Sequence, residues 1–311
     1  MTDWRPATTR EVIAARASLL SAIRAFFATR DVLEVDTPCL ARHGVTDRHI
    51  QCIAVPGYGF LQSSPEYHMK RLLAAGSGPI WQISKVFRDG EAGQKHNPEF
   101  SLLEWYRPGF SLNELITECV DLLRPVLRPE AVITHRFRTL FAQHTGLDPL
   151  ATSAPQLIDL ALRHGAPARL DAAASVDWLM ATLVEPGLPP RDLTIVSDFP
   201  GWAAALAKRR RDDDGVWVAE RFEIYFRGLE LANGYHELTD ADEQAARFAD
   251  DRQWRREQGL PDMDPDPHLL GALQQGLPDC SGVAIGIDRL LMAQTDIHDI
   301  RRLLNFPTGL A

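Results

Sequence analysis

One stretch of the chain, residues 83–106, constrains the fold more than any other. It holds two runs of strand-forming residues separated by a polar loop, so it predicts an antiparallel hairpin. Because side chains alternate between the two faces of a strand, this hairpin gathers two sets of residues on one face: Gln82, Ser84, Val86 and Arg88 from the first strand, and Phe100, Leu102, Glu104 and Tyr106 from the second. A guanidinium group and a carboxylate are thereby predicted on one sheet surface.

Such a surface can bind a phosphate through Arg88 and an ammonium group through Glu104. It therefore indicates a nucleotide and an amine lying side by side. The alternative is a hairpin whose charged side chains simply face water, as most single Arg and Glu residues do. The residues of the hairpin alone leave both interpretations open.

Composition predicts a soluble globular protein with one large α+β domain or two small ones, since the chain has 311 residues, of which 45% are hydrophobic and 24% charged. No apolar run approaches the roughly 20 residues that cross a bilayer, so no membrane association is expected. The first residues lack the basic start and apolar core of a secretory signal. We therefore expect a cytoplasmic protein.

Charge and cysteine content exclude some classes of site. A net charge of −9 argues against a broad surface for a nucleic-acid backbone, and the four cysteines form no CxxC pair of the kind that binds zinc. Three arginines at 209–211 run directly into three aspartates at 212–214. This run predicts a solvated loop whose charges compensate one another.

The pattern along the chain predicts one catalytic domain spanning residues 1–311, because no internal repeat or low-complexity linker interrupts it. A first helix is expected from Thr8 to Thr29, opened by a capping box of Thr8 and Glu11. Its inward face is predicted to consist of Ile13, Ala17, Leu20, Ile23 and Phe27. Residues from about 112 to 215 are rich in Ala, Leu and Pro and predict helical insertions.

A shorter helix is expected after residue 62. Ser63 or Ser64 is its predicted N-cap, Pro65 lies in its first turn, and Glu66 places a carboxylate against the helix dipole. Later segments return to strands, around residues 192–200 and 217–238, and residues 282–294 predict a strand that turns into a helix.

A second constellation lies in the sequence LELANGYHEL. Asn233-Gly234 is a strong signal for a two-residue hairpin turn, and such a turn would pair Glu230 with Glu237. Directly opposed carboxylates repel unless a cation or a shared proton intervenes, so the spacing predicts a Mg²⁺ site. The alternative is that one glutamate faces solvent or that the turn has another length, and the pattern does not decide between them.

A third element is Gly286 followed by Arg289 at the start of the last predicted helix. The glycine allows a flat base to approach the backbone, and the arginine can stack on that base or reach a phosphate. Alone, this pattern is more typical of a helix cap.

Together these elements resemble the three signature motifs of class II aminoacyl-tRNA synthetases, and the residues within them are most similar to those of the lysyl branch. FFATRDVLEVDTPCL with Pro38 resembles motif 1, VFRDGEAGQKHNPEFSLLEWY resembles motif 2, and GVAIGIDRLLM resembles motif 3. SPEYHMKRLL, HNPEF and ELANG make the resemblance specific. It implies an α+β fold, the class II catalytic domain, with an antiparallel sheet flanked by helices, and a homodimer formed through motif 1.

Motif 1 begins by about residue 26, which leaves no room for the N-terminal anticodon-binding domain of lysyl-tRNA synthetases. This architecture, together with the sequences EWYRP and CSGVA, resembles that of the elongation factor P (R)-β-lysine ligase family. That resemblance implies ATP-dependent activation of (R)-β-lysine, or lysine, and its transfer to a lysine side chain of elongation factor P.

The resemblance also implies the site residues. For ATP they are Arg88, Asp89, Gly90, His96, Asn97, Phe100, Glu230, Leu231, Gly286 and Arg289. For the amino acid they are Ser64, Pro65, Glu66, Glu104, Tyr106, Glu237 and Ala284. Glu230 and Glu237 would also hold Mg²⁺, and the expected catalytic residues are Arg88, Glu230, Glu237 and Arg289.

Two departures from the lysyl pattern stand out. Motif 2 usually begins Arg-Asn-Glu, whereas here Arg88 is followed by Asp89, Gly90 and then Glu91, so the carboxylate that assists ATP is not fixed. Ala284 occupies a position where lysyl-tRNA synthetases have glycine. One extra methyl group biases substrate choice by only about 1–3 kcal/mol.

Two other functions remain compatible with the sequence. The same chemistry can serve another acceptor, such as tRNA or a small molecule, although the net acidity argues against tRNA. A class II-like fold can also serve as a non-catalytic regulatory subunit.

Overall fold

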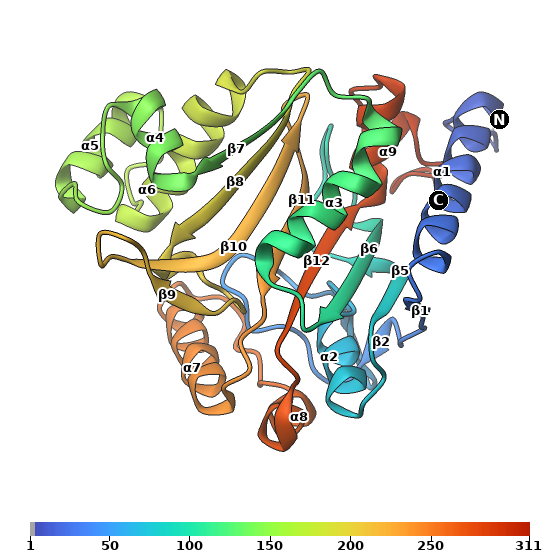
Figure 1. The fold of residues 1–311 in the computed structure, drawn as a ribbon, viewed down its shortest axis with the longest axis horizontal. Helices are drawn as coiled ribbons and strands as arrows, with labels where there is room; N and C mark the ends of the chain where they lie inside the picture. The colour runs from blue at the N-terminus through green and yellow to red at the C-terminus, as the bar shows by residue number, and fades with distance from the viewer. Residues whose placement is uncertain (1–3) are drawn as a thin grey trace. The chain divides into compact units, whose positions relative to one another are not determined.

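The computed structural model of the protein describes residues 4–311, and the chain forms two compact units. The first unit comprises Met1–Leu127 with Glu237–Ala311, and the second comprises the continuous segment Arg128–His236. Each unit combines helices with a mostly antiparallel set of strands, so the α+β fold class is confirmed (Figure 1). The prediction of one domain spanning the chain stays a prediction.

The first unit is built on strands β1 (Leu33–Glu34), β5 (Ile80–Phe87), β6 (Glu99–Pro108) and β12 (Cys280–Gly286), which lie in that order. β1 runs parallel to β5, and the other neighbours are antiparallel. A small second sheet contains β2 (Leu40–Ala41), β3 (Ala54–Val55) and β4 (Gly59–Leu61). The helices of the unit are α1 (Arg10–Ala28), α2 (Glu66–Ala74), α3 (Leu112–Leu127), α7 (Ala241–Glu257), α8 (Pro267–Gly276), α9 (Ile287–Thr295) and the short 3₁₀ turn Ile300–Arg302.

The predicted hairpin of residues 83–106 is confirmed as β5 and β6. Gln82 pairs with Glu104 and Ser84 with Leu102, so the residues predicted to share a face do so. β12 adds its own residues to that face, because Gly282 pairs with Tyr106 and Ala284 with Glu104.

Helices α1 and α3 cover the other face, and Figure 1 shows α3 crossing β12 and β6. Phe27 of α1 stacks on Trp81 with ring centroids 4.8 Å apart and meets Trp105 edge-on at 5.3 Å. The Trp105 indole N–H donates to Glu118 of α3 at 2.9 Å, so the buried ring has its polar partner. Burying an aromatic ring of this kind contributes roughly 2–3 kcal/mol, and this packing leaves the opposite face for the polar residues.

The start of α1 corrects the sequence prediction. The N-cap is Thr9 and not Thr8, and the buried side chains are Val12, Leu19, Ile23 and Phe27. Ile13, predicted to face inward, is 43% exposed. Moving the helix start by one residue removes the predicted capping box, because its spacing no longer joins the N-cap to Glu11.

The second unit has strands β11 (Leu229–His236), β10 (Trp217–Phe226), β8 (Leu193–Pro200) and β7 (Val132–Arg136) in that order, with β9 (Arg209–Arg211) on β10. Its helices are α4 (Phe137–Thr145), α5 (Ala154–Arg163) and α6 (Ala172–Leu179), followed by short turns at Met180–Val184, Glu185–Gly187 and Gly201–Ala203. The helices share a core with β8 and β10 that includes Phe141, Leu179 and Val196. The predicted helical region is therefore helical only in part, since it also contains β7 and β9.

The hairpin of this unit corrects the prediction for residues 233 and 234. The turn falls at Arg227-Gly228, where both residues have positive φ of 53° and 68°, and Phe226 pairs with Leu229 across it. Asn233 and Gly234 lie inside β11, opposite Glu223 and Phe222. Sheet pairing has overridden the local turn preference of Asn-Gly.

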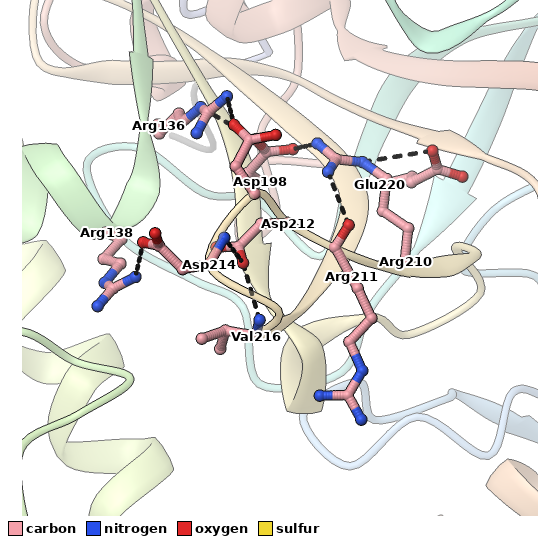
Figure 2. Close-up of polar contacts among 10 residues, drawn as sticks. Arg136, Arg138, Asp198, Arg210, Arg211, Asp212, Asp214, Val216 and Glu220 are labelled. Carbon is pink, nitrogen blue, oxygen red and sulfur yellow. Dashed lines mark hydrogen bonds and ion pairs between the residues drawn. The ribbon is translucent and has the colours of Figure 1, made fainter.

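A surface cluster of the second unit corrects the prediction for the run of arginines and aspartates (Figure 2). Its members are Arg136, Arg138, Asp148, Asp198, Arg210, Asp213, Asp214 and Glu220. Arg136 binds Asp213 at 2.9 Å, Arg138 binds Asp214 at 2.8 Å, and Arg210 binds Asp198 at 2.5 Å. The charges of the run are therefore compensated by other elements, because the turn at Asp212–Gly215 projects Asp213 and Asp214 away from β9.

None of the helices in the described residues 4–311 combines the length and the apolar content that a bilayer crossing requires.

Candidate active site

The beginning of α2 connects this helix to the sheet. The Ser64 hydroxyl accepts a hydrogen bond from the Glu66 amide at 3.0 Å and donates one to Glu104 at 2.7 Å. The N-cap is Pro65 and not the predicted Ser63 or Ser64, and a missing N–H at this position costs no helical hydrogen bond. Serine followed by proline thus starts the helix and fixes the direction of Glu66.

Glu104 and Tyr106 lie on the same face of β6, and both side chains are buried. The Tyr106 hydroxyl donates to Glu104 at 3.1 Å. Burial, together with the nearby Glu66 carboxylate, raises the pKa of Glu104 to about 8. Burial and the neighbouring Glu104 raise the pKa of Tyr106, so it stays a neutral donor.

Lys70 is the functional candidate that the sequence interpretation missed. Its ammonium nitrogen lies 2.7 Å from Glu66 and 2.6 Å from Glu237, and its side chain is only 2% exposed. Burial alone lowers the pKa of Lys70, but Glu237 and Glu66 outweigh it and raise that pKa, so the side chain is a cation. One signal was available, because Lys70 shares the buried stripe of α2 with Tyr67 and Leu73 at three-residue spacing.

These residues form one buried cluster in the first unit, with the members Ser64, Glu66, Lys70, Glu104, Tyr106 and Glu237. Seven residues were expected around the amino acid. Four of them are joined by hydrogen bonds, namely Ser64, Glu66, Glu104 and Tyr106, and Pro65 lies beside them. Lys70 joins Glu237 to this group. The cluster presents carboxylates that can receive ammonium groups.

Gly282 of β12 lies against this cluster. A Cβ atom at this position would lie 2.3 Å from the Tyr106 ring and 2.5 Å from a Glu237 oxygen, which no real side chain tolerates. The sequence interpretation singled out Ala284, which pairs with Glu104 and is half-buried. Gly282, two residues before Ala284, is the position in β12 where an added Cβ would collide with the cluster.

Arg88 follows β5 and is joined to the start of α2. Its guanidinium lies over the Phe100 ring, 5.1 Å from the centroid, and its Nε donates to the Ser63 carbonyl at 3.4 Å. The Glu91 carboxylate lies 3.7 Å from this guanidinium, whereas Asp89 accepts from the Gly90 amide at 2.9 Å. Glu91 is thus the carboxylate beside Arg88 in this departure from the usual motif 2.

Arg289 of α9 meets the loop between β5 and β6. Its guanidinium lies 2.5 Å from His96, and its aliphatic carbons lie 3.7 to 3.9 Å from the position of a Cβ on Gly286. Neighbouring Asp288 accepts from the Ser101 amide at 2.7 Å and also pairs with Arg16, which anchors α9 to the sheet and to α1. This anchoring brings Gly286, Arg289 and His96 together.

Asn97 has a structural use in this loop. Its amide donates to the Glu99 carbonyl at 2.7 Å and accepts from the Thr308 amide at 3.1 Å, and the residue is 7% exposed. Its side-chain hydrogen bonds thereby join the loop to the C-terminal segment.

Glu230 and Leu231 lie in β11 of the second unit. Glu230 pairs with Tyr225 across the hairpin, so the predicted pairing of Glu230 with Glu237 is wrong. Leu231 is 2% exposed, which places it in the core of its unit. The cause is the turn at Arg227-Gly228, which leaves both glutamates downstream of the same turn.

A polar network on β10 and β11 also escaped the sequence interpretation. Arg221 donates to Asn233 at 3.2 Å, pairs with Glu223, and lies over the Phe199 ring at 4.6 Å. Burial raises the pKa of Glu223, Arg221 opposes this shift, and Glu230 adds to it. The cross-strand pairing of Asn233 with Glu223 forms this network, and only the correct turn position predicts that pairing.

Comparison with known proteins identifies the family. The family model described as tRNA synthetases class II (D, K and N) matches residues 1–153 and 182–309. The chain belongs to this family.

Proteins named elongation factor P--(R)-beta-lysine ligase are similar over almost the whole chain. The one from Pasteurella multocida (strain Pm70) is 44% identical over 98% of this chain and 97% of its own length. The one from Haemophilus influenzae (strain PittGG) is 44% identical over 98% of both chains. The predicted resemblance to this group is confirmed.

Family membership also confirms that the chain is an ATP-dependent aminoacyl ligase. The stretch 154–181 that the family model omits corresponds to α5 and α6 of the second unit. Both the strands of the first unit and β10 and β11 of the second lie inside the matched residues.

Proposed function

We propose that this protein activates (R)-β-lysine with ATP and transfers the aminoacyl group to a lysine side chain of elongation factor P. Relatives at 44% identity are named elongation factor P--(R)-beta-lysine ligase, which supports this proposal. The observation that carries the proposal from the structure is the buried cluster, where Glu66, Glu104 and Glu237 gather beside a single internal cation. Such a site suits a substrate with two ammonium groups.

In the first step, a carboxylate oxygen of the amino acid attacks the α-phosphorus of ATP. A new O–P bond forms, the bond to the β-phosphate oxygen breaks, and pyrophosphate leaves. Arg88 and Arg289 are the guanidinium groups of the first unit that would stabilise the growing negative charge. Phe100 of β6 would orient Arg88, and His96 of the loop between β5 and β6 would orient Arg289.

In the second step, a neutral lysine amine of elongation factor P attacks the carbonyl carbon of the adenylate. An amide bond forms, AMP leaves with the electron pair of the broken C–O bond, and the amine gives up a proton. The binding groups for the amino-acid moiety are those already named: Ser64, Glu66, Glu104, Tyr106 and Glu237. They hold the ammonium groups in place during both steps.

Mg²⁺ fits the predicted pair of glutamates poorly. Glu237 is 1% exposed and its carboxylate binds Lys70 at 2.6 Å, so it serves a cation of the protein itself. Within residues 4–311, no group of three or more His, Cys, Asp or Glu side chains is arranged to hold a metal ion. We expect Mg²⁺ to accompany the phosphates of ATP, which are its usual ligands.

A homodimer is part of the proposal and is supported by the region that resembles motif 1. Leu33 is 59% exposed and Leu40 is 38% exposed, on either side of exposed Pro38. Exposed apolar residues gathered in this way favour a subunit interface. Light scattering should give twice the mass of 34.7 kDa, and Leu33→Glu should give the monomer mass.

The proposed reaction is tested in two stages. ATP–pyrophosphate exchange should depend on (R)-β-lysine, with weaker exchange for lysine. The enzyme, ATP and labelled (R)-β-lysine are then offered separately to elongation factor P and to lysine tRNA, and only the protein should be labelled. Exclusive labelling of the tRNA would contradict the proposed acceptor, and absence of exchange with every amino acid would favour a regulatory protein. A cytoplasmic location is part of the proposal.

A further inference from the structure

The position of Lys70 is chemically unusual. The residue is 1% exposed, it lies on α2, and its ammonium group touches two carboxylates that come from distant parts of the sequence. Burying a charge is costly unless it is paired, and removing one partner leaves the other charge uncompensated. The pairs with Glu66 and Glu237 therefore form a unit whose members depend on one another.

Both carboxylates also belong to the binding surface of the buried cluster. Glu66 influences the protonation of Glu104, and Glu237 lies close enough to Gly282 and Tyr106 to exclude any side chain at position 282. The ammonium group of Lys70 contacts both of these carboxylates. A substrate amine meeting Glu66 or Glu237 would thus meet a carboxylate that Lys70 already holds.

We propose that Lys70 is a positioning residue that determines specificity: it keeps Glu66 and Glu237 ionised and aimed together, so that the pocket receives a substrate with two amino groups. The inference rests on the proposed function and names how its substrate class is selected. Lys70 is not proposed to touch ATP or the reacting atoms. It acts through the two glutamates.

The charge balance explains why the lysine is needed. Two carboxylates that face each other without a cation share a proton, because one pKa of such a pair is strongly raised. The shared proton would remove one of the two acceptors for a substrate amine. With Lys70 between them, both carboxylates stay charged, and their summed charge with the lysine is a single negative charge that attracts a cationic substrate.

Other titratable groups around Lys70 do not replace it. β6 contributes Glu104 and Tyr106, which are an acid and a neutral phenol and supply no cation. α8 packs on α2 and contributes Asp266 and His268. Asp266 partly offsets the lowering of the His68 pKa that burial causes. Arg88 weakly opposes the raised pKa of Glu104, and the influences on the pKa of Lys70 come from Glu237 and Glu66.

The test compares Lys70→Met with a matched control, Lys85→Met. Lys85 belongs to β5, pairs with Glu99 at 3.2 Å, and is half exposed on the other face of the sheet. For Lys70→Met we expect KM for (R)-β-lysine in pyrophosphate exchange to rise roughly 10- to 100-fold, with KM for ATP unchanged. Lys85→Met should match the wild type in both constants.

The pH profile separates positioning from simple loss of structure. In Lys70→Met the shared proton of Glu66 and Glu237 must leave when substrate binds. The slope of log KM against pH should therefore be more negative than in the wild type by about one unit, which corresponds to one additional proton released. Lys70→Arg keeps the cation and should restore the wild-type slope even where its larger head group weakens binding. An unchanged KM and an unchanged slope in Lys70→Met would overturn the inference.

Two further measurements test the role of Lys70 if Lys70→Met does not fold or if the wild type shows no exchange. Where Lys70→Met fails to fold, the double variant Lys70→Met/Glu66→Gln removes the like-charge pair, and wild-type affinity of the folded double variant would overturn the inference. Where the wild type shows no exchange with any amino acid, the proposed function fails, and calorimetric binding of (R)-β-lysine to wild type and Lys70→Met still decides the role of Lys70. Equal affinities in that comparison would contradict it.

Discussion

Two regions of the molecule gather opposite charges, and they differ mainly in their access to water. In the buried cluster, Lys70 and Glu237 have side chains only 2% and 1% exposed. In the surface cluster, the side chains of Arg136 and Asp213 are 57% and 81% exposed, although their separation of 2.9 Å is close to that in the buried pair. Distance alone therefore does not distinguish the two regions.

The difference appears in what each cluster does to protonation and binding. Water screens the charges of the surface cluster, so its ion pairs contribute little and weaken further with salt. In the buried cluster, burial raises the pKa of Glu104 to about 8. A cation that binds beside such a desolvated carboxyl group strongly stabilises its charged form. The buried cluster therefore has the electrostatic character that we propose for the amino-acid site, whereas the ion pairs of the surface cluster hold the turn at Asp212–Gly215 in place.

The largest effect is expected for Gly282→Ala. The added methyl group meets the Tyr106 ring at 2.3 Å and Glu237 at 2.5 Å, so the side chains of the buried cluster must move. A displacement near 1 Å costs on the order of 100-fold in rate, and we expect at least that loss in kcat/KM for (R)-β-lysine.

Gly271→Ala is the matched control for that variant. Gly271 lies within α8, and a Cβ there meets no atom within 4 Å. Alanine in a helix is favoured over glycine by about 1 kcal/mol, so stability should rise slightly and activity should stay at the wild-type level. Full activity of Gly282→Ala would show that the buried cluster does not form the substrate pocket.

The next effect is the pH dependence of amino-acid binding. A substrate ammonium favours ionised Glu104 and lowers its pKa, so binding below pH 8 must release the proton that the free site holds. Affinity for (R)-β-lysine should therefore rise by up to about tenfold for each pH unit between pH 6 and 8 and then level off. Calorimetry in buffers of different ionisation enthalpy measures the released proton.

Glu104→Gln removes the titrating group and provides the control. The variant should bind (R)-β-lysine more weakly than the wild type does at pH 8, and its profile should be flatter. An affinity that stays constant for the wild type across this range would mean that Glu104 remains ionised in the free protein.

The smallest effect is expected in the surface cluster. Arg136→Met removes the contacts to Asp213 at 2.9 Å and to Asp198 at 3.6 Å. Because Arg136 and Asp213 are largely solvated and Asp198 keeps its pair with Arg210, we expect the thermal unfolding midpoint and the exchange activity to match the wild type at physiological salt. A large fall in either quantity would show that the surface cluster resembles the buried one after all.

Much of the fold of the first unit could be predicted from the sequence, for physical reasons that are local. The strands β5 and β6 follow from the two-residue period, and their pairing of Gln82 with Glu104 fixes the face that Glu104 and Tyr106 share. Ser64 and Pro65 mark the start of α2 because their chemistry suits a helix terminus. The expected roles of these residues in catalysis stay predictions.

The misses have a common cause, which is that tertiary pairing decides between local alternatives. Asn233-Gly234 is a better turn sequence than Arg227-Gly228, yet the pairing of β10 with β11 places the turn at the latter. Lys70 was overlooked because a lysine on a helix usually faces water, and only the fold brings Glu237 to it. Gly282 requires no special φ, so only the proximity of Tyr106 reveals its importance.

The central claim, that the buried cluster recognises two amino groups, is tested most directly by calorimetric titration of the wild-type protein at pH 8. The ligands are (R)-β-lysine and two analogues, each lacking one of its amino groups. Because a hydrogen bond to a charged group contributes about 1.5–3 kcal/mol, each analogue should bind at least about tenfold more weakly than (R)-β-lysine. Equal affinity for (R)-β-lysine and for either analogue would contradict the account.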